Sequence, residues 1–373
     1  MTQTTSQVNY RRPEYLGESV TLKQSEDVSI GLIIGCAQHM QADKSMRYDL
    51  CILDLDQSVV PVVSIPMPFF GHGVVPDPAN PHLVSVFAKR GPGACEIDIK
   101  EGRVTRIIPT AENRQFYGHG AYSHDGKLLY CTETIVEGDY KGLIAVRDAR
   151  THEYLGEMPS FGSSPHDCKL LDDGKTMVIT NGGGPLDGIP PSVTYVDVAS
   201  ESLIEKVEFD ADHVNAGHLD ITSTGKLAVV SAQREGMAKG TLGGISIRNG
   251  DQLHTLAEPQ QVIERLFDES LSVCINEEKG IVGATTPEGN LLTFWNIDSG
   301  ELLHYYIMRN PRGIELSLDG KYFVVSYGMQ DPEEAMCLFD SSTLAHVPGS
   351  DLQYTGITGS HLTAYAFPEG MRQ

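Results

Sequence analysis

The stretch FYGHGAYSHDGKLLYCTE, residues 116–133, contains the pattern that decides the fold. A histidine between two glycines comes first, an apolar run follows, DGK at 125–127 makes a turn, and a second apolar run, LLYCTE, completes the stretch. An Asp-Gly turn between alternating apolar runs is a strong signal for a β-hairpin. The stretch therefore predicts two antiparallel strands, the first of which starts near His119.

The same pattern recurs along the chain. A short motif opens each unit, and successive motifs lie 47, 47, 52, 94 and 49 residues apart. The longest interval spans two repeats, and the missing member falls near Ser272. The motifs are Gly-His-Gly at 71–73 and at 118–120, Pro-His-Asp at 165–167, Gly-His-Leu at 217–219, Pro-Arg-Gly at 311–313 and Ser-His-Leu at 360–362.

Each repeat reads as four antiparallel strands, which cannot bury their faces alone but can do so when stacked radially. We therefore predict an all-β protein, a seven-bladed β-propeller of four-stranded antiparallel blades, whose ring is closed by pairing the N- and C-terminal segments. Residues 1–25 are expected to form an N-terminal arm, and residues 26–373 a single domain. The seventh blade is split between 26–66 and 361–368, with 362–367 as its inner strand. A helical insertion is expected at Gln260–Phe267.

Composition limits the classes of partner. Lys and Arg number 28 against 50 Asp and Glu, which gives a net charge of −22 and disfavours nucleic acid and membrane surfaces. The seven cysteines have no C-x-x-C spacing and stand within apolar runs, as buried thiols of a reducing compartment do. The first residues contain no apolar segment typical of an export signal, so a cytoplasmic protein is expected. The oligomeric state stays open.

Five of the 13 histidines occupy the repeat position. In a propeller, a residue just before the inner strand lies beside the central channel, so the same position on neighbouring blades faces the same small volume. Neutral imidazole binds Fe, Cu, Zn and Ni, and convergent imidazoles favour a transition-metal site, with Fe(II) preferred and Cu second. Alternatively, these histidines are structural. The candidate ligands are His72, His119, His166, His218 and His361.

Polar residues follow the second strand of each repeat, which returns to the same face of the ring. We expect them to line a pocket for a small molecule, although they could instead satisfy loop backbone groups. The candidates are Gln38, His39, Lys89, Glu133, Asn181, Gln233, Thr286, Arg312 and Tyr327. Residues that could orient the imidazoles are Tyr117, Asp167, Asp220 and Glu315. Ligand is expected to enter over the glycine-rich loops at 134–141, 182–192 and 234–244.

The motifs at 116–133, GSSPHDCKLLDDGKTMVITNGG at 162–183, LLTFWNIDSGELL at 291–303 and FAKR at 87–90 resemble those of a bacterial β-propeller family of unknown function. Genes of that family often stand beside those for imelysin-type iron-uptake proteins. The resemblance covers nearly the whole chain and implies the propeller fold and an association with iron. It maps the family's histidine motifs onto the five candidate ligands, although Gly217 replaces an arginine and Ser360 an asparagine. Family members are often exported, unlike the expectation for this chain.

Three functions are compatible with this sequence. The first is a metal-dependent oxidoreductase or oxygenase, in which an all-histidine site keeps coordination positions open for a small molecule. The second is a non-catalytic protein that binds or delivers metal. The third is an interaction scaffold of the WD-repeat kind, in which the histidines serve the fold. Whether the protein is an enzyme therefore stays open, as do its substrate and the number of histidines that bind metal.

Overall fold

The computed structural model describes residues 29–57, 60, 62–91, 93–136, 141–329 and 334–366, without the side chain of residue 249. The expected N-terminal arm, residues 1–25, lies outside the described residues, as do residue 367 of the expected last strand and residues 137–140 of the 134–141 loop. The described chain is all-β, and its one helix is α1 (Gln260–Ile263). Within these residues, no helix has the length and apolar character needed to cross a membrane.

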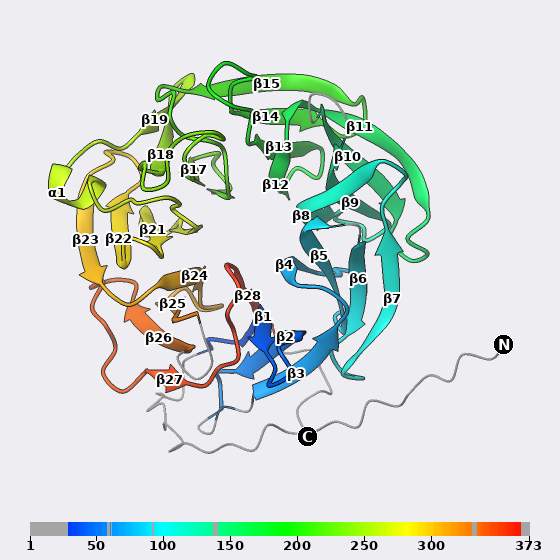
Figure 1. The fold of residues 1–373 in the computed structure, drawn as a ribbon, viewed down its shortest axis with the longest axis horizontal. Coiled ribbons are helices and arrows are strands. Elements are labelled where there is room, and N and C mark those ends of the chain that lie inside the picture. Colours follow the sequence, from blue (N-terminus) through cyan, green and yellow to red (C-terminus); the bar gives the residue numbers. More distant parts are fainter. Residues whose placement is uncertain are drawn as a thin grey trace.

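The strands form five hydrogen-bonded sheets arranged in a ring (Figure 1). The first sheet joins the two ends of the chain, in the order β28 (Leu362–Tyr365), β1 (Leu32–Met40), β2 (Met46–Asp54) and β3 (Val62–Met67). Its β1 and β28 run antiparallel, with Leu32 opposite Tyr365 and Gly35 opposite Leu362. The expected pairing of the N- and C-terminal segments is therefore confirmed.

Two sheets have eight strands each, because two links join neighbouring groups of four. In one, β5 pairs with β8 at Lys89 and Tyr117; in the other, β15 pairs in parallel with β19 at Glu208 and Gln252. The first contains β4 (Gly71–Pro76), β5 (Leu83–Gly91), β6 (Gly93–Asp98), β7 (Arg103–Pro109), β8 (Arg114–Tyr122), β9 (Leu128–Ile135), β10 (Lys141–Asp148) and β11 (Tyr154–Ser163). The second contains β12 (Pro165–Leu170), β13 (Thr176–Asn181), β14 (Ser192–Asp197), β15 (Ser202–Phe209), β16 (Leu219–Ile221), β17 (Leu227–Ser231), β18 (Gly244–Asn249) and β19 (Gln252–Thr255).

The remaining two sheets are simple antiparallel meanders of four strands. One contains β20 (Ser272–Asn276), β21 (Ile281–Thr286), β22 (Leu291–Asn296) and β23 (Leu302–Ile307). The other contains β24 (Pro311–Leu316), β25 (Tyr322–Tyr327), β26 (Ala335–Asp340) and β27 (Leu352–Gln353). In Figure 1, strands such as β4, β8, β12, β24 and β28 lie toward the middle of the ring, whereas β7, β15 and β23 lie at its rim.

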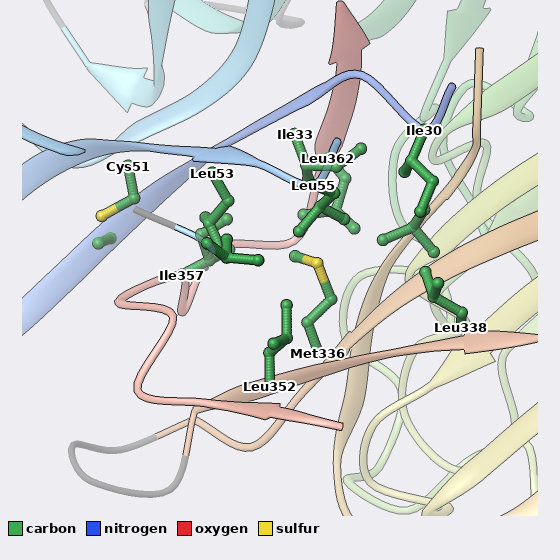
Figure 2. Close-up of a cluster of buried hydrophobic side chains, with 13 residues drawn as sticks. Ile30, Ile33, Cys51, Leu53, Leu55, Met336, Leu338, Leu352, Ile357 and Leu362 are labelled. Atoms are coloured by element: carbon green, nitrogen blue, oxygen red, sulfur yellow. The ribbon is translucent and has the colours of Figure 1, made fainter. Parts of the chain in front are cut away.

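The core lies between neighbouring groups of strands. The strand β17 lies inside its group of strands and is buried at every residue, whereas β15, at the rim of the ring, is largely exposed. At the seam of the ring, Ile33 and Leu53 from the N-terminal strands pack with Met336 and Leu352 from β26 and β27 (Figure 2). This apolar seam closes the ring in addition to the hydrogen bonds between β1 and β28.

The cysteines and the expected helix are the two local features on which the sequence made a specific prediction. All seven cysteines are buried and free, as expected of thiols within apolar runs. The expected helix over Gln260–Phe267 is wrong in length, because α1 covers only Gln260–Ile263. Beyond α1 the chain makes two isolated β-bridges, Phe267 with Leu242 and Glu269 with Ala232, so these residues are extended and not helical.

A candidate metal centre of five histidines

Four of the five histidines stand at the start of strands near the middle of the ring, and His119 lies inside the long strand β8. His72 lies on β4, His119 on β8 and His166 on β12, while His218 and His361 directly precede β16 and β28. The first four are buried and His361 is half-buried. The predicted convergence of the repeat position is thus present in the structure.

Irregular pairing at the repeat position turns these side chains out of the normal alternation. The β4–β5 ladder shifts register between Gly71 and Val74, and the ladder of β8 with β9 shifts between Phe116 and Gly120. The β12–β13 ladder shifts between Pro165 and Cys168. A bulge bends a strand locally and re-aims the side chains next to it. The histidine therefore lies within the irregularity on each of these three strands.

Glycines beside the histidines allow the imidazoles to pack closely. A Cβ atom at Gly73 would lie 2.6 Å from the carbonyl oxygen of Gly118 and 2.8 Å from Nδ1 of His119. Gly118 has a φ of +119°, and a Cβ atom there would lie 2.6 Å from the ring of His72. The Gly-His-Gly motifs are therefore needed for both the backbone conformation and the contact between two imidazoles.

The Nε2 atoms of the histidines converge on His218. Its Nε2 lies 3.0 Å from that of His72, 2.7 Å from that of His166 and 2.9 Å from that of His361. The Nε2 atoms of His361 and His72 lie 3.3 Å apart. His119 belongs to the same cluster, because ligand nitrogens of His72, His119, His218 and His361 lie within 4.8 Å of one another.

The Nδ1 atoms of three histidines point outward to groups that accept hydrogen bonds. His166 donates to the carbonyl oxygen of Tyr117 at 3.0 Å, and His218 donates to that of Leu271 at 2.5 Å. His119 Nδ1 lies 3.2 Å from Oδ1 of Asp167. Carbonyl oxygens cannot donate, so His166 and His218 carry their protons on Nδ1, and the carboxylate beside His119 favours the same tautomer there. Their Nε2 atoms are therefore left with lone pairs that point into the cluster.

A cation among the nitrogens would satisfy this arrangement. The lone pairs of His166 and His218 face each other at 2.7 Å, and the buried Nε2 of His119 has no hydrogen-bond partner among the described residues. Protonation of the imidazoles does not remove this repulsion between lone pairs, because burial, with neighbouring positive charge, lowers the pKa of all five histidines. Two ligands about 2.05 Å from one ion at 90–110° lie roughly 2.9–3.4 Å apart, close to the observed separations. The donor set therefore fits a transition metal.

Two pockets approach the cluster. The larger has a volume of about 1590 Å³ and is lined by His166 together with residues of the 182–192 and 234–244 loops. The smaller has a volume of about 500 Å³ and is lined by His119, His218 and His361. We refer to them as the loop-side pocket and the strand-side pocket. The histidine layer can thus be reached from both pockets.

Only part of the expected polar lining reaches the loop-side pocket. Lys89 and Gln233 line it, and Gln233 also donates weakly to Asp268 at 3.4 Å. Arg312 is half-buried and donates to the carbonyl oxygen of Gly359 at 3.4 Å. Gln38, His39 and Arg312 are not among the residues that line either pocket.

Four other candidates have structural partners away from the histidines. Glu133 is fully buried against Arg147, whose Nη2 lies 2.9 Å from Oε1. Asn181 is fully buried and accepts from Ser160 at 2.6 Å. The remaining two, Thr286 and Tyr327, bond the hydroxyl of Ser270 and the carboxylate of Asp351 respectively. None of these four lines either pocket.

The alternation of side chains along a strand explains why these candidates lie away from the pockets. The hydroxyl directly before Glu133, that of Thr132, is 3.2 Å from the amide nitrogen of His119 and also donates to its carbonyl oxygen at 3.0 Å. Thr180, directly before Asn181, is 2.9 Å from the amide nitrogen of Asp167 and donates to the carbonyl oxygen of Gly217 at 2.6 Å. Successive side chains face opposite sides of a strand. The residue that supports the inner strand is therefore one position earlier than expected.

The expected orienting residues divide into two pairs. Asp167 contacts His119, and the carbonyl oxygen of Tyr117 accepts from His166, with the two rings 5.8 Å apart. Asp220 instead pairs with Lys169 at 2.6 Å and accepts from the amide of Ile275. Glu315 accepts from the amide of Leu316 at 2.9 Å and lines the strand-side pocket. Neither carboxylate of this second pair has a bond to a histidine among those described.

Two groups that bond the histidines were not predicted from the sequence. The hydroxyl of Ser360 lies 3.1 Å from Nδ1 of His72, and the carbonyl oxygen of Leu271 accepts from His218. Ser360 directly precedes His361, a position that could have been noticed in the repeat. The carbonyl of Leu271 carries no side-chain signal, so only the folded structure brings it to the site.

Comparisons with known proteins give a family but no activity. A family model described as "Protein of unknown function (DUF1513)" matches residues 65–351, a range that contains four of the five histidines and excludes His361. No curated protein matches the chain. One similar solved structure is Kuenenia stuttgartiensis hydrazine synthase, with a TM-score of 0.62 and 15% identity over 82% of this chain and 95% of that chain. At this identity the likeness concerns the fold alone.

Proposed function

The chain belongs to the family described as "Protein of unknown function (DUF1513)", and from the geometry of its histidine cluster we propose that it is a metal-dependent oxidoreductase acting on a small molecule. The metal would lie on the axis of a seven-bladed β-propeller. The observation that carries the proposal is the convergence of Nε2 lone pairs around His218, at separations of 2.7–3.0 Å.

The strand pairings support the seven-bladed form. Removing the two links, β5 with β8 and β15 with β19, divides the eight-stranded sheets into four antiparallel meanders of four strands. Together with the sheets of β20–β23, β24–β27 and β28 with β1–β3, these make seven such groups. The histidines belong to five of these groups, which follow one another around the ring.

The metal would be held by His72, His119, His218 and His361, with His166 as a fifth ligand whose Nε2 is 2.7 Å from that of His218. Imidazole ligands suit Fe(II) and Cu, and the resemblance to a family encoded beside iron-uptake genes favours Fe(II) first. When bound by four or five histidines, such an ion leaves a coordination position open and supplies redox or Lewis-acid chemistry.

The protein's own residues would hold and shield this centre. Asp167 and the carbonyl oxygens of Tyr117 and Leu271 keep the protons of three imidazoles on Nδ1, which leaves Nε2 free to bind. The buried positions of His72, His119, His166 and His218 limit access of water to the cluster. A small molecule would enter through the loop-side pocket, beside His166, as the glycine-rich loops suggest.

The test is metal analysis of untagged protein, followed by measurement of O₂ consumption with candidate reductants. We expect about one Fe or Cu per chain, and loss of that metal from H218A without loss of folded structure. Retention of a full complement of metal by H218A would overturn the axial site. Metal without any turnover would instead favour the alternative of a non-catalytic binding or delivery protein, and a folded protein that binds no metal would favour a scaffold.

A further inference from the structure

Two cations stand in the loop-side pocket with no ion-pair partner among the residues that the structure describes. Lys89 and Arg90 are consecutive on β5, are both exposed and both line this pocket. The guanidinium of Arg90 lies 5.3 Å from the ring centre of Tyr117, whose ring in turn contacts His166. The pair is unexpected in a chain with a net charge of −22, where anionic partners for surface cations are abundant.

Lys89 stands on the side from which the histidine cluster is reached. It lines the loop-side pocket together with His166, whose Nε2 lies 2.7 Å from that of His218. The positive charge of Lys89 repels a metal cation at the cluster. An anion between the two cations is attracted by both of them, so the metal and an anionic ligand in this pocket would favour each other's binding.

We propose that Lys89 and Arg90 bind the carboxylate of a small organic acid, which approaches the histidine cluster through the loop-side pocket. This inference rests on the proposed metal site and names the substrate class of that same site. The planar guanidinium of Arg90 matches the two oxygens of a carboxylate, and the ammonium of Lys89 contributes a point charge. Ser163, Ser164 and Gln115 line the same pocket and offer further polar groups.

The rest of the pocket wall limits the charge of the ligand. Asp187, Glu235, Asp268 and Glu269 also line it, with Lys239 as one further cation. These carboxylates repel a second negative charge on the ligand, so a monocarboxylate fits better than a dicarboxylate or a phosphate, which carries about two negative charges at neutral pH. The end of the ligand remote from Lys89 is expected to be neutral or positively charged.

The coupling between metal and carboxylate gives a direct test. The affinity for Co(II), a stand-in for Fe(II), is measured by competition with a chelator in sodium chloride and in sodium acetate of equal ionic strength. We expect acetate to tighten Co(II) binding roughly tenfold in the unmodified protein, because coupled ligands increase each other's affinity by the same factor. In the K89Q/R90Q variant the effect of acetate should fall below about twofold, which is less than the coupling of about fivefold or more typical of linked sites.

The variants also separate this role from a structural one. In chloride, K89Q/R90Q should bind Co(II) at least as tightly as the unmodified protein, because a repulsive charge has been removed. The matched control is K100Q, which removes one charge from an exposed residue that lines neither pocket and should keep the full acetate effect. Weaker Co(II) binding by K89Q/R90Q in chloride would overturn the proposal, as would an acetate effect equal to that of K100Q.

Two further outcomes are decisive. An effect of sulfate equal to that of acetate would overturn the assignment of a carboxylate in favour of oxyanions in general. If the unmodified protein binds no Co(II), the proposed metal function fails, and the carboxylate site is judged separately by titrating metal-free protein with ¹³C-acetate and observing its NMR signal. Binding that is lost in K89Q/R90Q and kept in K100Q would support the site, and absence of binding would overturn it.

Discussion

Five inner strands carry a histidine at the repeat position, whereas β20 and β24 carry Ser272 and Arg312 there. Ser272 accepts from the amide of Ile314 at 3.3 Å, and Arg312 donates to the carbonyl oxygen of Gly359 at 3.4 Å. The ladder of β24 with β25 shifts register between Pro311 and Ile314, as the ladders of β4, β8 and β12 do at their histidines. The fold therefore forms the same irregular strand start without histidine, which argues that the five histidines serve a function.

Removal of the C-terminal strand should have the largest effect on this comparison, because it removes a histidine and the closure of the ring together. A chain that ends after Ser360 lacks His361 and β28, so β1 loses its inner partner and the seam loses Leu362. We expect its thermal unfolding, followed by circular dichroism, to lose cooperativity. The matched control ends after Ala366 and should unfold like the full chain. A cooperative transition in the shorter chain would show that the ring does not depend on this pairing.

Replacement of one histidine and of its serine counterpart should separate metal binding from folding. H218A removes the nitrogen nearest to three others, so we expect metal affinity to fall by more than about 100-fold, since even the partners of metal ligands are worth 10–100-fold. S272A should leave metal content unchanged and cost about 1 kcal/mol of unfolding free energy through its lost hydrogen bond. Elemental analysis and denaturant unfolding measure the two effects.

The motifs around His119 and His166 are the most regular of the repeat, so the sequence predicts that these two are the firmest ligands. H119A and H166A should therefore lose metal too, although the geometry favours a larger loss in H218A. Equal metal content in H218A and S272A would contradict the distinction between the two sets of strands.

A smaller effect is expected from the carboxylates that follow the histidines. D167N removes the negative charge that keeps the proton of His119 on Nδ1, so metal affinity should fall about 10- to 100-fold. D220N is the control, because Asp220 also lies shortly after a histidine, two residues beyond His218, but pairs with Lys169. D220N should leave metal affinity within about twofold of that of the unmodified protein, a change in binding free energy no larger than the thermal energy. Equal losses in the two variants would mean that Asp167 acts on the fold and not on the imidazole.

The smallest effect concerns Glu315, on a strand that lacks a histidine. Burial raises the pKa of this carboxyl to about 7, above the value of roughly 4.3 expected in the unfolded chain. Between these values the folded state holds more protons than the unfolded state, so this group's contribution to stability falls as pH rises from about 4.3 to 7. In E315Q that contribution should disappear, and the unfolding free energy should decline less with pH. Identical pH dependences in urea unfolding would disprove the raised pKa.

Much of the site could be predicted from spacing alone, because the repeat brings equivalent positions to one axis. The convergence of His72, His119, His166, His218 and His361 required only the period and the recognition of each unit. The neighbouring polar residues were harder to assign, since an error of one position changes the face of a strand. Thr132 and not Glu133 supports His119, and this choice depends on the register of β9 against β8.

The sequence by itself determined the all-β class, the pairing of the N- and C-terminal segments and the five histidines that meet. These predictions rest on a repeat of turns and alternating apolar residues, and each unit of the repeat can be recognised from local sequence. The tertiary structure decided which imidazole nitrogens face inward, since Nδ1 of His218 and His166 bond carbonyl oxygens of Leu271 and Tyr117. Backbone carbonyls occur at every residue and leave no mark in the sequence. Their positions near an imidazole follow only from the packing of neighbouring strands around the ring.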